Sequence, residues 1–106
     1  MEKKIQFILP DIFGDTVRVK ILEVLLEVSL KKAPVWLNIS QLAKHAQIST
    51  SSSKRIVDEL IESNLVTLKP IETHAKHPEK EIILNLDDKR IKELLFFYRK
   101  LKGFMR

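Results

Sequence analysis

The fold is decided by residues 38–66, which read NISQLAKHAQISTSSSKRIVDELIESNLV. The first part of this stretch predicts a short helix. Asn38 offers a side-chain oxygen that caps a helix N-terminus, and Gln41, three residues later, completes a capping-box pattern. Apolar residues at positions 39, 42, 43 and 46 then recur at the spacing of one helix face. A capped helix is therefore expected to begin directly after Asn38.

A second helix is predicted directly after the first. Ser49 offers another N-cap, and apolar residues at positions 56, 57, 60 and 61 form a second stripe at helical spacing. Asn64 falls where this helix should end, because asparagine tolerates the left-handed backbone conformation that closes helices. Two helices so close in sequence must cross at a steep angle, which predicts a helix-turn-helix.

The outward face of the second helix changes chemistry along its length. Ser51, Ser52 and Arg55 lie in its first half, whereas Glu59 and Glu62 lie in its second half. Phosphates repel carboxylates and a helix N-terminus favours an anion, so this polarity favours a helix that enters a DNA groove by its N-terminus. The alternative interpretation is a solvated polar face with a serine-rich cap.

The first half of this helix supplies the predicted DNA contacts. Hydroxyl and guanidinium groups bond base edges and phosphate oxygens. Ser51, Ser52 and Arg55 are expected to approach bases, while the remaining members of the set fix the phosphate backbone. The predicted contact residues are Ser49, Thr50, Ser51, Ser52, Lys54 and Arg55.

Length and composition exclude several classes of protein. The chain has 106 residues, which is one small domain, and 44% apolar residues suffice for an ordinary core. It has no cysteine, its two glycines form no phosphate-binding loop, and its acidic residues have no spacing that pairs them for catalysis. Neither catalysis nor a cofactor is therefore predicted. No apolar run approaches the roughly 18 residues of a membrane span. An intracellular, cytoplasmic protein without a membrane partner is expected.

The segments before the helix-turn-helix predict an arm, a helix and a short strand. Residues 1–15 contain Pro10, Asp11 and Gly14 and are expected to form an extended N-terminal arm and a turn. A helix starting at Asp15 or Thr16 is apolar nearly all around, which predicts a central position. Residues 35–37 form a short β-prone run.

A β-hairpin is predicted after the helix-turn-helix, with strands over residues 65–69 and 80–86. Apolar residues at 82, 84 and 86 alternate with positions 83 and 85, which is a half-buried pattern. The hairpin would carry a wing whose predicted phosphate contacts are Lys69, Thr73, His74, Lys76, His77 and Lys80. An ordinary solvated loop is one alternative. A metal pair of His74 and His77, completed by Glu72 or His45, is a weaker one, because structural zinc requires four ligands.

The last predicted helix starts at Asp87 or Asp88 and runs to about Lys102, where Gly103 should end it. Its apolar surface exceeds what a small domain covers, so residues 87–106 are predicted to dimerise the chain. The predicted interface residues are Ile91, Leu94, Leu95, Phe97, Tyr98, Leu101, Phe104 and Met105. The alternative is that this helix folds back on its own core.

The chain carries a net charge of +5, and the excess lies in this last helix, where seven Lys/Arg face three acidic residues. A modest positive excess suits nucleic acid or another polyanion. A homodimer would read two half-sites about 34–36 Å apart.

Residues 38–66 resemble the winged helix-turn-helix transcription regulators, particularly the small dimeric MarR-like and ArsR-like proteins of bacteria and archaea. Leu42-Ala43 is similar to the family's Leu-Ala in the first helix, and Ile48-Ser49 to its turn and cap. The ending Asn64-Leu65-Val66 is similar to the family's Gly-Leu-Ile. The resemblance implies a recognition helix over residues 50–63 and a wing over 70–80.

The chain departs from the family pattern at three places. Gln47 stands where the family often has glycine, and Ser53 occupies a position that is usually apolar and inward. The wing lacks the Asp-x-Arg signature common in MarR-like proteins.

Together these observations predict an α+β, mostly helical protein with a winged helix-turn-helix over residues 16–86. The predicted function is sequence-specific binding of double-stranded DNA by a dimeric transcription regulator, which represses by occupying a promoter. A sequence-independent architectural DNA-binding protein and a winged helix used for protein–protein contact are the alternatives.

Overall fold

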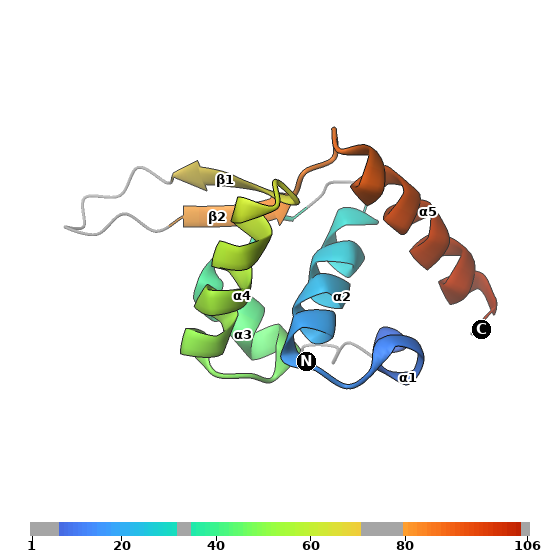
Figure 1. Cartoon of the computed structure of the whole chain (residues 1–106), viewed down its shortest axis with the longest axis horizontal. Coiled ribbons are helices and arrows are strands. Elements are labelled where there is room, and N and C mark those ends of the chain that lie inside the picture. Colours follow the sequence, from blue (N-terminus) through green and yellow to red (C-terminus); the bar gives the residue numbers. More distant parts are fainter. Residues whose placement is uncertain (1–6, 32–34, 71–79, 105–106) are drawn as a thin grey trace.

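The computed structural model describes residues 7–31, 35–70 and 80–104. Within these residues the chain forms five helices and one antiparallel hairpin (Figure 1). The elements in chain order are α1 (Leu9–Phe13), α2 (Val17–Ser29), α3 (Ile39–Ala46), α4 (Thr50–Glu62), β1 (Val66–Pro70), β2 (Lys80–Leu84) and α5 (Lys89–Phe104). This arrangement confirms the mostly helical fold in which a helix-turn-helix precedes a hairpin and a C-terminal helix.

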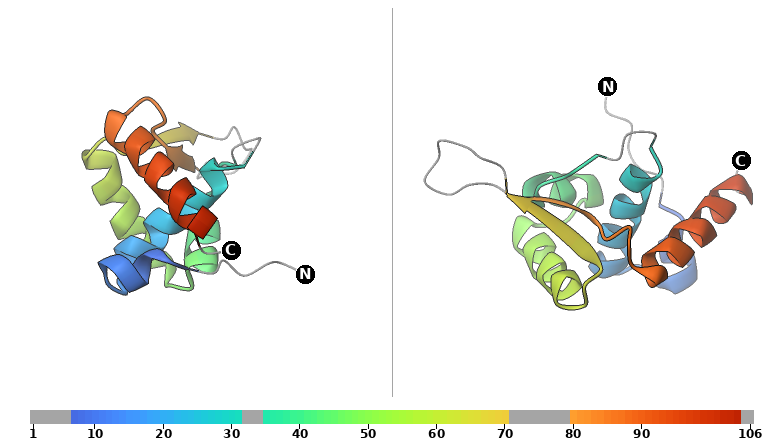
Figure 2. Two further views of the ribbon diagram at one scale, coloured as in Figure 1. Left: turned by 90° about the vertical axis from the view of Figure 1, so that its right-hand side faces the viewer. Right: turned by 90° about the horizontal axis from the view of Figure 1, so that it is seen from above.

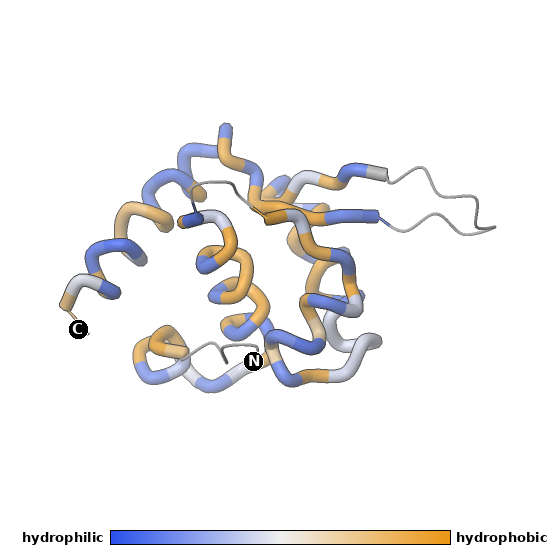
Figure 3. Tube along the Cα trace, turned by 180° about the vertical axis from the view of Figure 1, so that it is seen from behind, coloured by the Kyte–Doolittle hydropathy of each residue, from blue (hydrophilic) through white to orange (hydrophobic). Residues whose placement is uncertain are grey.

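Helix α2 lies at the centre of the molecule. The side chains of Ile21, Val24 and Leu25 are completely buried, and α2 packs against α1, α3, α4 and β2. Viewed from above, α4 and the hairpin lie on one side of α2 and α5 on the other (Figure 2). Hydrophobic residues follow most of α2 (Figure 3), as its sequence pattern predicts for a central helix.

The predicted caps of α3 and α4 are confirmed. Asn38 Oδ1 accepts a hydrogen bond from Gln41 N at 2.8 Å, and Gln41 Oε1 accepts one from Asn38 N at 2.9 Å. Ser49 caps α4, and Asn64 has the left-handed φ of 63° expected after α4. These contacts join residues only a few positions apart, so the two helices begin and end where local sequence dictates.

The first two departures from the family pattern are accommodated differently. Gln47 closes α3 with a left-handed φ of 59°, a conformation that disfavours residues with a Cβ atom. Ser53 is completely buried, and its hydroxyl donates a hydrogen bond to the Ile39 carbonyl at 3.2 Å. A polar contact therefore joins α3 and α4 where an apolar side chain was expected.

The prediction of an extended arm over residues 1–15 is wrong for the part that the structure describes. Leu9–Phe13 forms the short helix α1, with Pro10 in its first turn and Gly14 after its end at a φ of 101°. Proline suits a helix start because its fixed φ is helical and its missing N–H is not needed there. The Leu9 side chain is buried, so α1 is anchored on the core.

The alternation predicted for the second strand is also wrong. Ile83 is buried together with Ile82 and Leu84, whereas Leu86 is exposed. The cause is a third segment, because Leu37 pairs with Ile82 through backbone hydrogen bonds of 3.1 and 2.7 Å. Continuing this antiparallel register by one residue places the half-buried Trp36 beside Ile83. Residues 35–37 thus contribute one bridge rather than a full strand.

Helix α5 begins where the sequence predicts but ends later than predicted. Asp88 Oδ1 accepts a hydrogen bond from Arg90 N at 2.8 Å, which confirms Asp88 as the residue that caps this helix. Gly103 does not end α5, which continues to Phe104. One glycine costs an exposed helix only about 1 kcal/mol, so it need not terminate one.

Candidate nucleic-acid interface

The N-terminus of α4 presents a cluster of hydroxyl groups. Ser49 Oγ accepts a hydrogen bond from Ser52 N at 3.1 Å and lies 2.8 Å from Ser52 Oγ and 3.3 Å from Ser51 Oγ. Thr50 is exposed beside them. The cap thus fixes the backbone while the hydroxyl groups remain at the surface, where oxygen and hydrogen can both bond an incoming group.

The two cations of α4 differ in their partners. Lys54 Nζ pairs with Asp58 Oδ2 one turn later at 3.1 Å, and both side chains are exposed. Arg55 is exposed and makes no hydrogen bond or ion pair with another residue that the structure describes. Its guanidinium group can therefore approach a ligand without breaking a contact within those residues.

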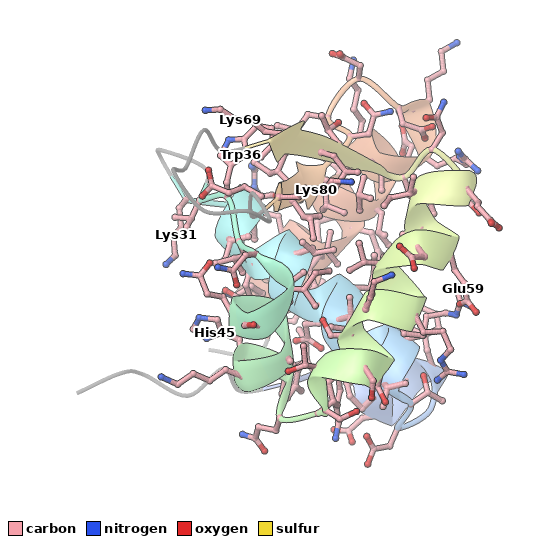
Figure 4. The ribbon with its side chains drawn as sticks, turned by 90° about the vertical axis from the view of Figure 1, so that its left-hand side faces the viewer. Lys31, Trp36, His45, Glu59, Lys69 and Lys80 are labelled. Carbon is pink, nitrogen blue, oxygen red and sulfur yellow. The ribbon has the colours of Figure 1, made fainter. Side chains whose placement is uncertain are left out.

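The C-terminal half of α4 is acidic and is held by other elements. Glu59 forms an ion pair with Arg18 of α2, and the Leu60 side chain is buried in the core. Figure 4, which looks onto the helix-turn-helix and the hairpin, places Glu59 on the side of α4 away from Lys69, Lys80 and His45. The Glu59 carboxylate is thus separated from the cations of the hairpin.

Two of the predicted wing residues, Lys69 and Lys80, lie at the ends of the two strands that face residues 71–79, and both are exposed. Lys69 Nζ lies 5.7 Å from the centre of the Trp36 ring, a cation–π geometry. Thr73, His74, Lys76 and His77 lie outside the described residues, as does the suggested histidine pair. No three potential ligands gather at a metal-binding distance in the part of the chain that the structure describes.

Sequence reasoning missed the contact between the end of α4 and the start of α5. Arg90 Nη2 donates a hydrogen bond to the Ser63 carbonyl at 2.8 Å, and Arg90 pairs with Asp88 at 2.9 Å. The hydrogen bond from the Arg90 side chain lowers the pKa of Asp88 to about 2, and backbone N–H groups of α5 act in the same direction. No local sequence pattern predicts these contacts, because Ser63 and Arg90 are 27 residues apart.

Some residues of the predicted dimer surface on α5 are buried in the core, and others are exposed. Ile91 and Tyr98 are buried against the core of their own chain, which corrects their prediction as interface residues. Leu94, Leu95 and Leu101 are partly buried against the same core. Phe97 is 40% exposed and Phe104 is 83% exposed, whereas Met105 lies outside the described residues. The helical spacing predicted an apolar face but could not apportion it between the core and a partner.

The structure adds residues of α1 to the exposed apolar surface, which the sequence analysis had placed on the last helix alone. Ile12 and Phe13 of α1 are both more than half exposed, as is Phe96 of α5. The rings of Phe13 and Phe97 have centroids 6.4 Å apart, so α1 and α5 share one apolar surface. A pair of large apolar residues directly before Gly14 was the available signal.

Tyr98 is buried in the core, and its hydroxyl lies against two carboxylates of α2. Its hydroxyl lies 2.8 Å from Glu23 Oε2 and 2.7 Å from Glu27 Oε1, and Lys102 pairs with Glu27. Burial raises the pKa of Tyr98 well above its usual value, and the two carboxylates add to this effect. The tyrosine hydroxyl therefore stays protonated and joins α5 to α2.

Neither a protein-family model nor a curated protein sequence matches this chain. Solved structures do match its fold. A candidate DNA-binding protein from Ralstonia eutropha JMP134 aligns with a TM-score of 0.60 and 20% identity over 79% of this chain and 95% of its own. A MarR family transcriptional regulator from Silicibacter pomeroyi DSS aligns with a TM-score of 0.57 and 18% identity over 92% of this chain. RV1404 from Mycobacterium tuberculosis aligns with a TM-score of 0.58, 17% identity and 92% coverage of this chain.

These likenesses define the class of fold, which is the winged helix-turn-helix. The chain spans 57% of the Silicibacter regulator and 62% of RV1404, so its fold corresponds to a part of each. At such low identity the fold is shared without the function being shown. No helix among the described residues is long and apolar enough to cross a bilayer.

Proposed function

We propose that this chain is a sequence-specific double-stranded DNA-binding transcription regulator of the MarR type, with α4 as its recognition helix. The observation that carries the proposal is the polarity of α4. Its first half exposes hydroxyl groups and Arg55, which has no partner among the described residues, whereas Glu59 in its second half is paired with Arg18. A duplex that meets the N-terminal half gains donors and a helix N-terminus without meeting an uncompensated Glu59.

The proposed contacts divide between bases and phosphates. Ser51, Ser52 and Arg55 approach base edges, for which arginine bonding to guanine is the commonest specific contact. Ser49, Thr50 and Lys54 fix the phosphate backbone. Lys54 must exchange Asp58 for a phosphate, which costs little because an exposed i, i+4 ion pair contributes only about 0.3–0.5 kcal/mol.

The hairpin is proposed to contact phosphates, and α5 is proposed to take part in dimerisation. Lys69 and Lys80 contact phosphates beside the groove that α4 enters. Two copies of the chain associate through the exposed apolar surface formed by Ile12, Phe13, Phe97 and Phe104, whose side chains are between 40% and 83% exposed. A homodimer bound at a promoter in the cytoplasm would repress transcription by excluding polymerase. The protein acts by binding rather than by catalysis.

Fluorescence anisotropy tests the proposal. The purified protein is titrated against duplex from its own upstream region and against a scrambled duplex of equal length, across a salt series. We expect a preference of roughly a thousandfold or more for its own DNA. Equal binding to both, falling steeply with salt, would instead favour an architectural protein. Negligible binding to either at physiological salt, with a protein partner that copurifies, would favour a protein–protein module.

The oligomeric state is tested separately by light scattering after size exclusion. Phe97→Ser and Phe104→Ser are expected to convert a dimer to a monomer, because both remove exposed apolar area. Arg99→Ser is the matched control, since Arg99 is exposed on the same helix and, two residues after Phe97, lies on the opposite side of it. A parent protein that is monomeric at micromolar concentration would remove the dimer from the proposal.

A further inference from the structure

The turn that ends α4 is bonded to the start of α5 through three consecutive carbonyl groups. Ser63 O accepts a hydrogen bond from Arg90 Nη2 at 2.8 Å. Asn64 O accepts one from Asn85 Nδ2 at 3.0 Å, and Leu65 O accepts one from Asn85 N at 2.9 Å. Carbonyls at and just after a helix C-terminus need donors from elsewhere, and here the donors are Asn85, between β2 and α5, and Arg90 in the first turn of α5.

Arg90 is itself held in place by Asp88. Arg90 Nε and Nη2 donate to the two carboxylate oxygens at 3.0 and 2.9 Å, and Asp88 Oδ1 also caps α5. A two-point contact fixes the plane of the guanidinium group, which a lysine ammonium could not do. We call Asn85, Asp88 and Arg90 the α4–α5 clamp. The clamp thus connects the C-terminal end of α4 to the N-terminal turn of α5 in one defined geometry.

Elsewhere α5 diverges from the rest of the fold. Its axis runs away from α4 on the far side of α2 (Figures 1 and 2). Its buried side chains are Ile91 and Tyr98, and Tyr98 and Lys102 join it to α2. Through Arg90, the clamp bonds α5 directly to Ser63, the residue that follows α4. The direction of α4 relative to α5 therefore depends on two connections, the packing of both helices on α2 and the clamp at their facing ends.

We propose that Arg90, held by Asp88 and assisted by Asn85, is a positioning residue that sets the direction of α4 relative to α5. This inference rests on the proposed function, in which α5 dimerises the chain and α4 enters the groove. In such a dimer the clamp would set the spacing between the recognition helices of the two copies. A residue that only stabilised the fold would change the free energy of unfolding without changing this geometry.

The geometry is tested in the free protein by distance measurements between spin labels. The chain has no cysteine, so Thr50→Cys on α4 and Lys100→Cys on α5 provide two exposed attachment sites. Dilution with unlabelled protein isolates the distance within one chain. We expect Arg90→Ala and Arg90→Lys to broaden or shift the distance distribution, whereas Arg99→Ala, an exposed arginine of α5 outside the clamp, leaves it unchanged. A distribution unchanged in Arg90→Ala would overturn the proposal.

The consequence for DNA is tested with unlabelled protein. Each base pair inserted between half-sites turns one half-site by roughly a tenth of a helical turn relative to the other. The parent should lose about tenfold in affinity for such a duplex, an effect comparable to a mismatch. Arg90→Ala should lose most of this discrimination while keeping its affinity for a single half-site. An equal loss on half-site and full site would contradict the proposed role.

The two experiments separate failure of the inference from failure of the proposed function. If the parent shows no specific DNA binding, the proposed function fails, and the distance measurement alone decides whether the clamp fixes α4 on α5. Thermal unfolding followed by circular dichroism confirms that each variant is folded. Asn85→Ala, which removes the side-chain bond to Asn64, gives a second and independent weakening of the clamp.

Discussion

The two halves of α4 differ in how the rest of the molecule uses them. The first half exposes Arg55 and a cluster of hydroxyl groups. Its contacts with the rest of the fold are made on the inward face, by Ser53 and the buried apolar residues beside it. The second half is held from outside as well, by Arg18 of α2 and by Arg90 at the start of α5. The comparison shows how one helix can offer polar groups at one end because its other end is firmly placed.

The largest effect is expected where the second half of α4 enters the core. Leu60 is 3% exposed, so Leu60→Ala should lower the free energy of unfolding by about 2–5 kcal/mol through lost burial and a cavity. Urea denaturation measures this change. Glu62→Ala, two residues later and exposed, is the control and should change stability by no more than about 0.5 kcal/mol. Similar losses for the two variants would contradict the role assigned to this half.

The first half should show the opposite response. Arg55→Ala should weaken specific DNA binding by about 1–3 kcal/mol. Because Arg55 is exposed, the free energy of unfolding should stay within about 0.5 kcal/mol of the parent. Anisotropy titrations and urea denaturation measure the two quantities, with Arg99→Ala as the matched control. An equal loss on specific and random duplexes would remove Arg55 as a base-reading residue.

The turn before α4 offers a smaller gain. Gln47 has a left-handed φ of 59°, so Gln47→Gly should raise the free energy of unfolding by up to about 1 kcal/mol. Thermal and urea unfolding measure the gain. Ser40→Gly on the exposed side of α3 is the matched control, since its helical backbone predicts a loss of about 0.5 kcal/mol. Destabilisation by both variants would show that the turn carries no relievable strain.

The ion pair between Arg18 and Glu59 should contribute less. Their side chains are 53% and 41% exposed, so Glu59→Gln should cost at most about 1 kcal/mol, and less at high salt. Urea denaturation at low and high salt measures the cost. A double-mutant cycle with Arg18→Gln isolates the pair from other effects of each substitution. A coupling that persists unchanged in high salt would contradict an exposed electrostatic contact.

The smallest effect is expected on the free energy of unfolding at acidic pH. The pKa of Asp88 is lowered to about 2 from 3.8, so its ionised form stabilises the fold above about pH 4, and this contribution is lost as the pH falls toward 2. Denaturation at several pH values should show the parent more stable than Asp88→Asn near neutrality. The difference should shrink below pH 4. A constant difference would assign the effect to capping geometry rather than charge.

Contacts between residues close in sequence could be predicted from the sequence, whereas contacts between distant residues could not. Asn38, Ser49 and Asn64 act on neighbours within a few residues, so their roles in starting and ending α3 and α4 were predicted correctly. Tyr98 binds Glu23 across 75 positions, and its helical spacing could not distinguish a core residue from an interface residue. The clamp was missed for the same reason, because the Ser63 carbonyl carries no side-chain signal for Arg90.

Glu23 connects the beginning and the end of the chain at one buried carboxylate. It accepts hydrogen bonds from the backbone N–H groups of Ile8 and Leu9, and it lies within hydrogen-bonding distance of the Tyr98 hydroxyl. A buried carboxylate that loses a donor is costly, so undocking either terminal segment weakens the site that holds the other. The two ends should consequently exchange their amide hydrogens as one cooperative unit, although about 90 residues of chain separate them.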